Sequence, residues 1–359
     1  MIDPALFQEN DRTAPSANER QLVHVGHLDC ECCKRLDEVT IAFETWGTLN
    51  SNKDNAVLIC HALSGDSHAI GWWDRLIGPG KAFDTNHYFV IGSNSLGGCQ
   101  GTTGPSSISP TGEPYGSDFP MITVGDMVEV QSRLIEYLGI SKLHCVAGGS
   151  MGGMQALEWT VRFPKRVKKA FVTASCARHS PMQIAINEVG RQAILRDPNY
   201  NGGDYYAGEQ PSNGLSVARM IGHISFLSGS AFEAKFSRRL QNKSSFSMDF
   251  GVEFEVEGYL SYQGDKFTTR FDPNSLLHLT RAIDYFDWEG VEEAEAEFLF
   301  VSFTSDWLYT SAQSKELFEM VTRVGRKAMY QEIDLPYGHD AFLLDGEEQG
   351  EVLRAFLAT

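Results

Sequence analysis

The 359-residue sequence predicts an α/β fold in which a mostly parallel sheet is flanked by helices. Short apolar runs, typical of buried strands, alternate with segments whose apolar residues recur at helical spacing. Such alternation favours a parallel sheet. A second observation supports this class: a glycine-framed serine, Ser150, lies between a predicted strand and a predicted helix, in the stretch 148–152.

The stretch around Ser150 indicates a nucleophile elbow. A serine at a sharp strand-to-helix turn adopts a strained backbone, so its neighbours must be almost free of side chains, and we expect Gly148 and Gly152 to supply that freedom. The helix that follows would present free N–H groups and a positive dipole end. This arrangement predicts the α/β-hydrolase fold, the alternative being a glycine-rich turn or phosphate cradle.

The first part of this fold is expected to span residues 1–177, with 1–20 polar and frayed. Segments 22–25 and 39–46 alternate between apolar and polar residues and predict an antiparallel hairpin. The elements expected next are strands at 56–60 and 88–91, a helix over 123–138 that stops at Gly139, the elbow, and a strand at 169–174.

The pattern changes to mainly helical segments between 178 and 290, where helices are expected over 184–196 and 214–227. We interpret 178–290 as a helical insertion that covers the site, and call it the lid. Residues 291–359 would then complete the core, with strands at 297–303 and 328–333 and a final helix over about 346–357. No internal repeat is evident.

Composition limits the classes of partner. The formal charge of −17, from 30 basic and 47 acidic residues, argues against a nucleic-acid or anionic-membrane surface, although a local basic pocket for an anionic substrate remains compatible with it. Neither a leader-like segment nor a membrane-spanning apolar run is evident. A soluble, cytoplasmic protein is therefore expected.

Seven cysteines in a chain of this length do not predict a disulfide scaffold. One group is unusual, because two histidines and three cysteines fall close together: His24, His27, Cys30, Cys32 and Cys33. They could gather a soft metal, but their spacing matches no standard zinc pattern. We expect no metal, and a metal at this cluster stays open as the alternative.

Activating a serine requires a base and a third group that orients the base. Asp306 follows the predicted strand at 297–303, and His339 follows the strand at 328–333. The order Ser, Asp, His is the one this fold uses, because the three loops leave the same edge of the sheet. His278 lies in a helix-like segment and is expected to pack instead. The predicted triad is therefore Ser150, Asp306 and His339.

An oxyanion requires two convergent donors, one of them from the residue after the nucleophile. We assign these donors to the backbone amides of Met151 and Leu63, the latter in the stretch 61–65. To this point the residues predict acyl chemistry through a serine ester. They leave open whether water or another molecule accepts the acyl group.

Several further segments resemble the homoserine O-acetyltransferase family, from about residue 21 to the C-terminus. They are 44–47, 61–66, 94–106, 118–120, 148–155, 187–194, 218–223, 262–264, 270–274 and 338–342. The resemblance implies a ping-pong reaction of methionine biosynthesis, in which Ser150 accepts acetyl from acetyl-CoA and L-homoserine then takes it. It also implies a homodimer and no permanently bound cofactor. The CoA-contacting residues cannot be identified from the sequence.

By the same resemblance, Arg219 matches a substrate-binding arginine suited to a carboxylate, and Asp340 matches the position that holds the acceptor amine. Leu308 stands where succinyl-using relatives tend to have arginine, which favours acetyl. Gly190 departs from the family pattern, which more often has a longer polar residue there. The alternatives are L-serine as acceptor, a succinyl donor, an esterase of the same fold, or a non-enzymatic ligand-binding relative.

Overall fold

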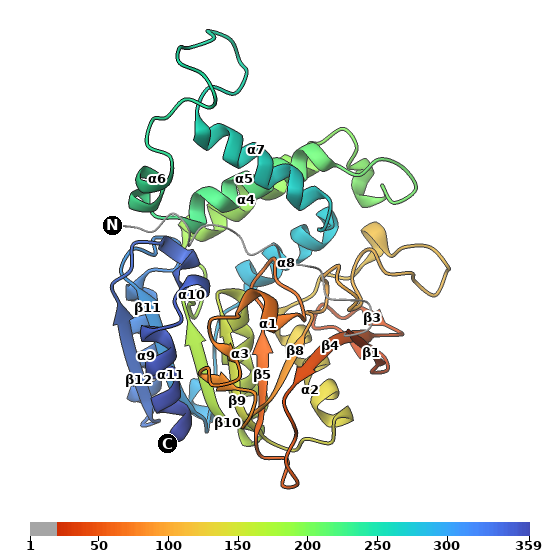
Figure 1. Cartoon of the computed structure of the whole chain (residues 1–359). Coiled ribbons are helices and arrows are strands. Elements are labelled where there is room, and N and C mark those ends of the chain that lie inside the picture. Colours follow the sequence, from red (N-terminus) through yellow and green to blue (C-terminus); the bar gives the residue numbers. More distant parts are fainter. Residues whose placement is uncertain (1–19) are drawn as a thin grey trace.

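The computed structural model describes residues 20–359, and it confirms the predicted α/β-hydrolase fold (Figure 1). A central sheet lies between two layers of helices, and further helices lie over one end of the sheet. Of the segment 1–20 that we expected to be frayed, all but Arg20 falls outside the described residues.

The main sheet has eight strands in the order β1-β4-β8-β5-β9-β10-β11-β12. β1 pairs antiparallel with β4, which confirms the predicted hairpin. β4 also pairs antiparallel with β8, and all the other neighbouring strands are parallel. The strands are β1 (Gln21–His24), β4 (Thr40–Trp46), β8 (Phe89–Ser93), β5 (Ala56–Cys60), β9 (Leu143–Gly149), β10 (Val167–Thr173), β11 (Glu297–Phe303) and β12 (Ala328–Ile333). The carboxyl ends of the parallel strands therefore meet at one edge.

Two short pairs of strands lie outside this sheet. They are β2 (Leu28–Asp29) with β3 (Arg35–Leu36), and β6 (Ile77–Gly78) with β7 (Phe83–Asp84). The first pair stands between β1 and β4, in the stretch that contains the cysteine group. These strands were not predicted, because two-residue strands carry no detectable periodicity.

Each face of the sheet has its own apolar core. Along β5, Leu58 joins the core on one face and Val57 the core on the other, as the alternation of a strand requires. The first core is covered by α2 (Val124–Tyr137), α3 (Met151–Arg162) and α9 (Ser311–Arg323). The second is covered by α1 (Ala69–Trp72), α10 (Ala341–Leu344) and α11 (Glu348–Ala358).

The helix starts follow local capping chemistry. Thr123 and Asp126 form a reciprocal capping box at the start of α2, and Ser180 and Gln183 form another at the start of α4 (Pro181–Leu195). Gly139 ends the α2 segment with a φ of 69°, a conformation that favours glycine. These capping interactions set where the two helices begin, and α4 begins three residues before the predicted start at 184.

The chain between β10 and β11 is helical and lies over the carboxyl edge of the sheet (Figure 1). Its helices are α4 (Pro181–Leu195), α5 (Ser212–Phe226), α6 (Gly229–Lys235), α7 (Glu255–Thr268) and α8 (Pro273–Tyr285). At its base Arg178 and Asp287 form an antiparallel bridge and an ion pair of 3.4 Å. The lid boundaries predicted at 178 and 290 fall beside this bridge.

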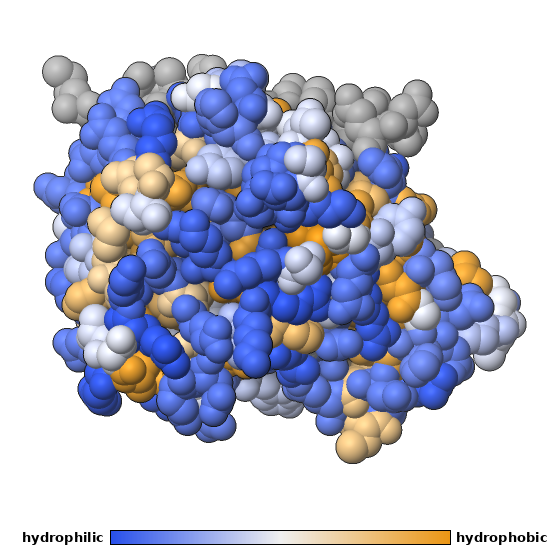
Figure 2. All heavy atoms as spheres, turned by 90° about the horizontal axis from the view of Figure 1, so that it is seen from below, coloured by the Kyte–Doolittle hydropathy of each residue, from blue (hydrophilic) through white to orange (hydrophobic). Residues whose placement is uncertain are grey.

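Hydrophilic side chains cover most of the face opposite the lid, and hydrophobic patches on it are separate from one another (Figure 2). Within residues 20–359, no helix combines the length and apolar character needed to cross a membrane.

The cysteine group does not assemble into a ligand set. Cys30 is buried, whereas Cys32 and Cys33 are exposed at a turn. Burial is the main cause that raises the pKa of the Cys30 thiol, to about 12. No group of three potential ligands gathers in the described part of the chain, so the metal alternative gains no support.

His278 packs, as expected. It lies on α8 with its ring perpendicular to Phe119 at 5.2 Å between centroids. Loss of hydration lowers its pKa from 6.5 to about 4.

This lowered pKa predicts a pH-dependent stability. Below pH 6.5 the unfolded chain binds a proton at His278 that the folded chain does not, so folding weakens until the pH reaches about 4. Between pH 7 and pH 5 we expect this residue to reduce the free energy of unfolding by about 2 kcal/mol. Urea denaturation of wild type and His278→Leu at both pH values measures it. The difference in free energy of unfolding between wild type and His278→Leu should change by that amount from pH 7 to pH 5. An equal pH dependence of the two proteins would contradict the prediction.

Candidate active site

Ser150 stands at the turn between β9 and α3 with φ 56° and ψ −126°, the strained conformation predicted for an elbow. Its backbone N–H donates to the carbonyl oxygens of Thr173 and Ala174, both at 3.1 Å. The Ser175 hydroxyl donates to the Ser150 carbonyl at 2.8 Å. The end of β10 (Val167–Thr173) and the two residues after it therefore hold the serine through both its N–H and its carbonyl.

The glycines around Ser150 are required for a reason other than the expected one. We expected Gly148 and Gly152 to supply conformational freedom, but neither has a positive φ, and the strained residue is Ser150 itself. A Cβ on Gly152 would lie 2.0 Å from the Cys60 carbonyl oxygen, and one on Gly148 would lie 2.3 Å from the backbone of Gly152. Glycine is needed because backbone segments approach each other closely.

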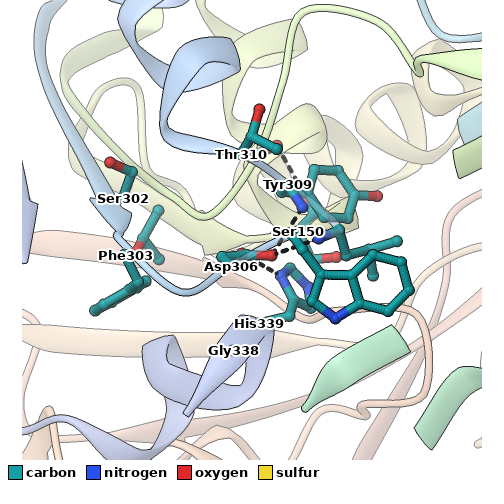
Figure 3. Close-up of polar contacts among 12 residues, drawn as sticks. Ser150, Ser302, Phe303, Asp306, Tyr309, Thr310, Gly338 and His339 are labelled. Carbon is teal, nitrogen blue, oxygen red and sulfur yellow. Dashed lines mark hydrogen bonds and ion pairs between the residues drawn. The ribbon is translucent and has the colours of Figure 1, made fainter. Parts of the chain in front are cut away.

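The predicted acid and base come together at the same edge. The Nδ1–H of His339, in the 3₁₀ helix η6 (Gly338–Asp340), donates to Oδ2 of Asp306 at 2.8 Å. Oδ1 of Asp306 accepts from the amides of Leu308 and Tyr309 at 3.0 and 2.8 Å. This pattern leaves Nε2 of His339 to act as a base. Ser150 lies next to this pair, as Figure 3 shows.

Aromatic rings surround the His339 imidazole. Tyr309 stacks on it with 4.8 Å between centroids and 22° between planes, while Phe342 and Phe226 lie at 5.3 and 6.2 Å. The side chain is shielded from solvent, since only 3% of the residue is exposed. Interactions with charge are stronger in such surroundings than in water.

The two predicted oxyanion donors are available. Among the hydrogen bonds of residues 20–359, none uses the amide of Leu63 or Met151. Met151 begins α3, where the helix leaves its first N–H groups without internal partners. Leu63 lines the cavity in front of Ser150.

His61 holds the loop that carries Leu63. Its Nδ1–H donates to the Ala62 carbonyl at 2.8 Å, and its Nε2 accepts from the Ser95 amide at 2.9 Å. Burial is the main cause that lowers the pKa of His61, which keeps the ring in the neutral form that this pattern needs. No role was predicted for His61 from the sequence.

A cavity of about 760 Å³, including its opening to solvent, lies between the sheet edge and the lid. Ser150, Arg219 and Leu308 line it, as the predictions require. Nη1 of Arg219 donates to the Ser64 hydroxyl at 3.2 Å. Asp340 follows His339 in η6 but is not among the lining residues, so its role in holding an amine stays a prediction.

Three residues of this region were missed by sequence reasoning. The Tyr309 hydroxyl lies 2.7 Å from Nε2 of His179, and Nδ1 of His179 donates to Asp284 at 2.8 Å. They come from the loop after Asp306, the loop after β10, and α8. No short-range motif links them, because the fold alone brings them together.

The lid is attached to the loops that carry the acid and the base. The Trp307 indole N–H donates to the Leu227 carbonyl at 3.0 Å. The Ser228 hydroxyl donates to the Pro336 carbonyl. A Cβ on Gly338 would meet the Ser228 amide at 2.5 Å, so glycine is required beside His339 as well.

A strained serine after β9, an aspartate after β11 and a histidine after β12, in this order, are typical of an α/β hydrolase. The family model described as the alpha/beta hydrolase fold matches residues 55–345. Within this class, the homoserine O-acetyltransferase of Methanohalobium evestigatum is 54% identical over 348 residues, covering 92% of this chain and 71% of that protein. The chain belongs to the homoserine O-acetyltransferase family.

Solved structures agree with this assignment and widen it. The homoserine O-acetyltransferase from Bacillus anthracis superposes with a TM-score of 0.89 at 29% identity, covering 95% of this chain and 98% of that one. Esterase E22 superposes with a TM-score of 0.88 at 31% identity, covering 94% and 99%. The same backbone thus occurs in proteins named as transferases and as esterases.

The close backbone approach at the elbow yields a prediction. Gly152→Ala should destabilise the protein by about 1–3 kcal/mol and displace Ser150, because its Cβ would overlap the Cys60 carbonyl oxygen. Gly229→Ala is the matched control, since nothing lies within 4 Å of a Cβ there. Thermal unfolding of both variants measures the effect. Equal midpoints for the two would contradict the steric argument.

Proposed function

We propose that this protein is a CoA-dependent homoserine O-acetyltransferase that works through an acyl-Ser150 intermediate. The observation that carries the proposal is the 54% identity to a homoserine O-acetyltransferase over 92% of this chain. The geometry of Ser150, Asp306 and His339 supplies the chemistry. The reaction would belong to methionine biosynthesis in the cytoplasm, with acetyl-CoA as a substrate and no permanently bound cofactor.

In the first step Ser150 Oγ attacks the thioester carbonyl of acetyl-CoA, and Nε2 of His339 takes the hydroxyl proton. The amides of Leu63 and Met151 stabilise the oxyanion of the tetrahedral intermediate. The C–S bond then breaks, and the thiolate of CoA receives the proton from the imidazolium. Asp306 holds the imidazole and stabilises its cation through the 2.8 Å hydrogen bond.

In the second step the side-chain hydroxyl of L-homoserine attacks the acyl-enzyme. His339 now takes the proton of that hydroxyl, and the ester bond to Ser150 Oγ breaks as the proton passes to Oγ. The products are O-acetyl-L-homoserine and free enzyme. Arg219 would bind the substrate carboxylate through its planar guanidinium, and Asp340 would hold the amine.

Acetyl is the favoured acyl group because Leu308 lines the cavity beside Ser150 and offers no charge to a succinyl carboxylate. Arg191 also lines the cavity, but it is paired with Asp284 at 2.7 Å and with Glu188 at 3.0 Å. A succinyl donor, and L-serine as acceptor, are the rival substrates.

A homodimer is the proposed assembly. Met182 and Val189 lie seven residues apart on α4, and Val217 and Ile224 have the same spacing on α5, so each pair shares a face of its helix. Their exposed fractions are 60, 53, 47 and 40%. Burial of these side chains against a second copy would remove the apolar surface from water.

Hydrolysis is the second candidate function, because esterase E22 shares the backbone at 31% identity. One assay separates the two. The protein is mixed with acetyl-CoA and with L-homoserine, L-serine or buffer, and free thiol and O-acetyl amino acid are followed. Rapid thiol release that depends on homoserine supports the transferase. Release that is independent of any acceptor would establish the esterase instead.

Ser150→Ala should lose the activity. We expect kcat to fall by about 10⁴-fold or more, because no nucleophile remains to form the ester. Intact-mass measurement after mixing with acetyl-CoA should detect an acetylated wild type and an unmodified variant. Normal turnover by Ser150→Ala would refute the acyl-serine mechanism.

Asp340→Ala should separate the two steps. Acylation by acetyl-CoA should change by less than about twofold, while transfer to homoserine falls by about 10- to 100-fold, the range expected for a lost hydrogen bond to a charged amine. Pre-steady-state thiol release and the KM for homoserine measure the two steps. Glu348→Ala, at an exposed acid on α11, is the control. An unchanged homoserine KM would contradict the assigned role.

A further inference from the structure

Tyr309 lies where three parts of the site meet. It follows Asp306 in the loop between β11 and α9, and it lines the cavity together with Ser150. Its ring stacks on His339, and its hydroxyl lies 2.7 Å from Nε2 of His179. It also interacts with the Ser150 side chain, an interaction that lowers the pKa of Tyr309 against the larger effect of burial. The net pKa is well above 10, so the phenol keeps its proton.

His179 is hydrogen-bonded to Asp284, which forms a buried ion pair with Arg191. Asp284 accepts from Nδ1–H of His179 at 2.8 Å, from Asn187 at 2.8 Å and from Arg191 at 2.7 Å. Burial raises the pKa of Asp284, but hydrogen bonds from His179, Asn187 and Arg191 together hold it below its ordinary value. Asp284 is therefore a carboxylate, and the side chains of His179 and Asp284 are only 2 and 3% exposed.

The direction of the hydrogen bonds follows from this charge. A carboxylate can only accept, so Nδ1 of His179 carries the proton. When the His179 ring is neutral, its Nε2 is an acceptor, and the Tyr309 O–H donates to it. The phenol oxygen consequently presents its lone pairs, and not its proton, to Ser150.

We infer that Tyr309, oriented by the buried His179–Asp284 pair, is a positioning residue for both Ser150 and His339. Without His179 the phenol could donate to Ser150 Oγ and occupy the lone pair needed for attack. The stacked ring also faces the imidazolium that forms at each proton transfer, and an aromatic face attracts such a cation. This inference rests on the acyl-serine chemistry of the proposed function, but it does not depend on the natural donor or acceptor.

Two other titratable groups surround Tyr309. The Cys176 thiol and the Asp306 carboxylate both act, with Asp284, to raise the Tyr309 pKa. Burial also raises the pKa of Cys176, to about 12. Neither the phenol nor this thiol therefore ionises in the range where His339 is studied, so a change of pH profile in a Tyr309 variant reports on one of the two histidines that contact it, His339 or His179.

The test uses p-nitrophenyl acetate, an ester that acylates a reactive serine directly. Single-turnover release of nitrophenolate is followed from pH 5 to pH 9 for wild type, Tyr309→Phe and Tyr309→Leu. Tyr309→Phe removes the hydroxyl that contacts Ser150 and His179, so acylation should slow by about tenfold. It keeps the stacked ring, so the midpoint on the acid limb should stay the same. Tyr309→Leu removes the ring as well and should also lower that midpoint by about half to one pH unit.

A double-variant cycle tests the pair behind the phenol. His179→Asn should slow acylation by about tenfold, and Tyr309→Phe/His179→Asn should be no slower than either single variant, because His179 acts through the Tyr309 hydroxyl. The matched control is Tyr285→Phe, which removes a hydroxyl from a tyrosine that is 59% exposed on α8. It should behave as wild type.

Three outcomes would overturn the inference. They are an acylation rate of Tyr309→Phe equal to that of wild type, an unchanged midpoint on the acid limb for Tyr309→Leu, or a double variant whose acylation rate falls by the product of the two single effects. Thermal unfolding measurements check that each variant is folded. If His179→Asn does not fold, the acylation rate of Tyr309→Phe alone tests the inference. A normal nitrophenolate burst without any acetylation of homoserine would instead count against the proposed function while leaving this inference standing.

Discussion

The close contact between the start of α3 and the end of β5 is the constraint on which the site depends. Because Gly152 lies directly over the Cys60 carbonyl, the helix can begin one residue after Ser150, and the serine takes up the strain with a φ of 56°. The same contact brings the Met151 amide toward the loop that carries Leu63. Nucleophile and oxyanion donors are therefore placed by one packing interaction between two backbones, and His61 fixes the loop side of it.

The lid is part of this machinery as well as its cover. Asn187 and Arg191 on α4 donate to Asp284 on α8. Asp284 holds His179, which in turn orients Tyr309. The junction between α5 and α6 separately contacts the loops of Asp306 and His339 through Leu227 and Ser228. A change in lid position would consequently be felt at the acid, the base and the nucleophile. Buried polar contacts of this kind favour one arrangement over others, because any shift leaves groups without partners.

Local signals account for what could be predicted. The bounds of β11 and β12 were predicted from their apolar runs. The elbow of Ser150 and the loops of Asp306 and His339 were located because in each of them the reactive residue lies within a few residues of the end of a strand. The β2–β3 hairpin was missed because its strands are too short for a period. The reason for glycine at position 152 was predicted wrongly. A Cβ there would lie 2.0 Å from the carbonyl oxygen of Cys60, and Cys60 is about 90 residues away in the sequence, so no local pattern reveals the contact. The Tyr309–His179–Asp284 contacts were missed for the same reason: each partner lies in a different element, and no single segment contains the pattern.

The difference between hydrolysis and transfer must lie in the cavity, because both reactions use the same serine, base and oxyanion donors. Much of the cavity wall is apolar and comes from the lid, including Ile186, Ala218, Ile221, Leu276 and Ile283. An apolar wall offers water few hydrogen bonds, so water near the acyl group is poorly held. Under the proposed function, an amino-acid acceptor would obtain binding energy from Arg219, which lines the same space. That binding energy places its hydroxyl at the ester, which is how a bound acceptor can outcompete a far more concentrated solvent.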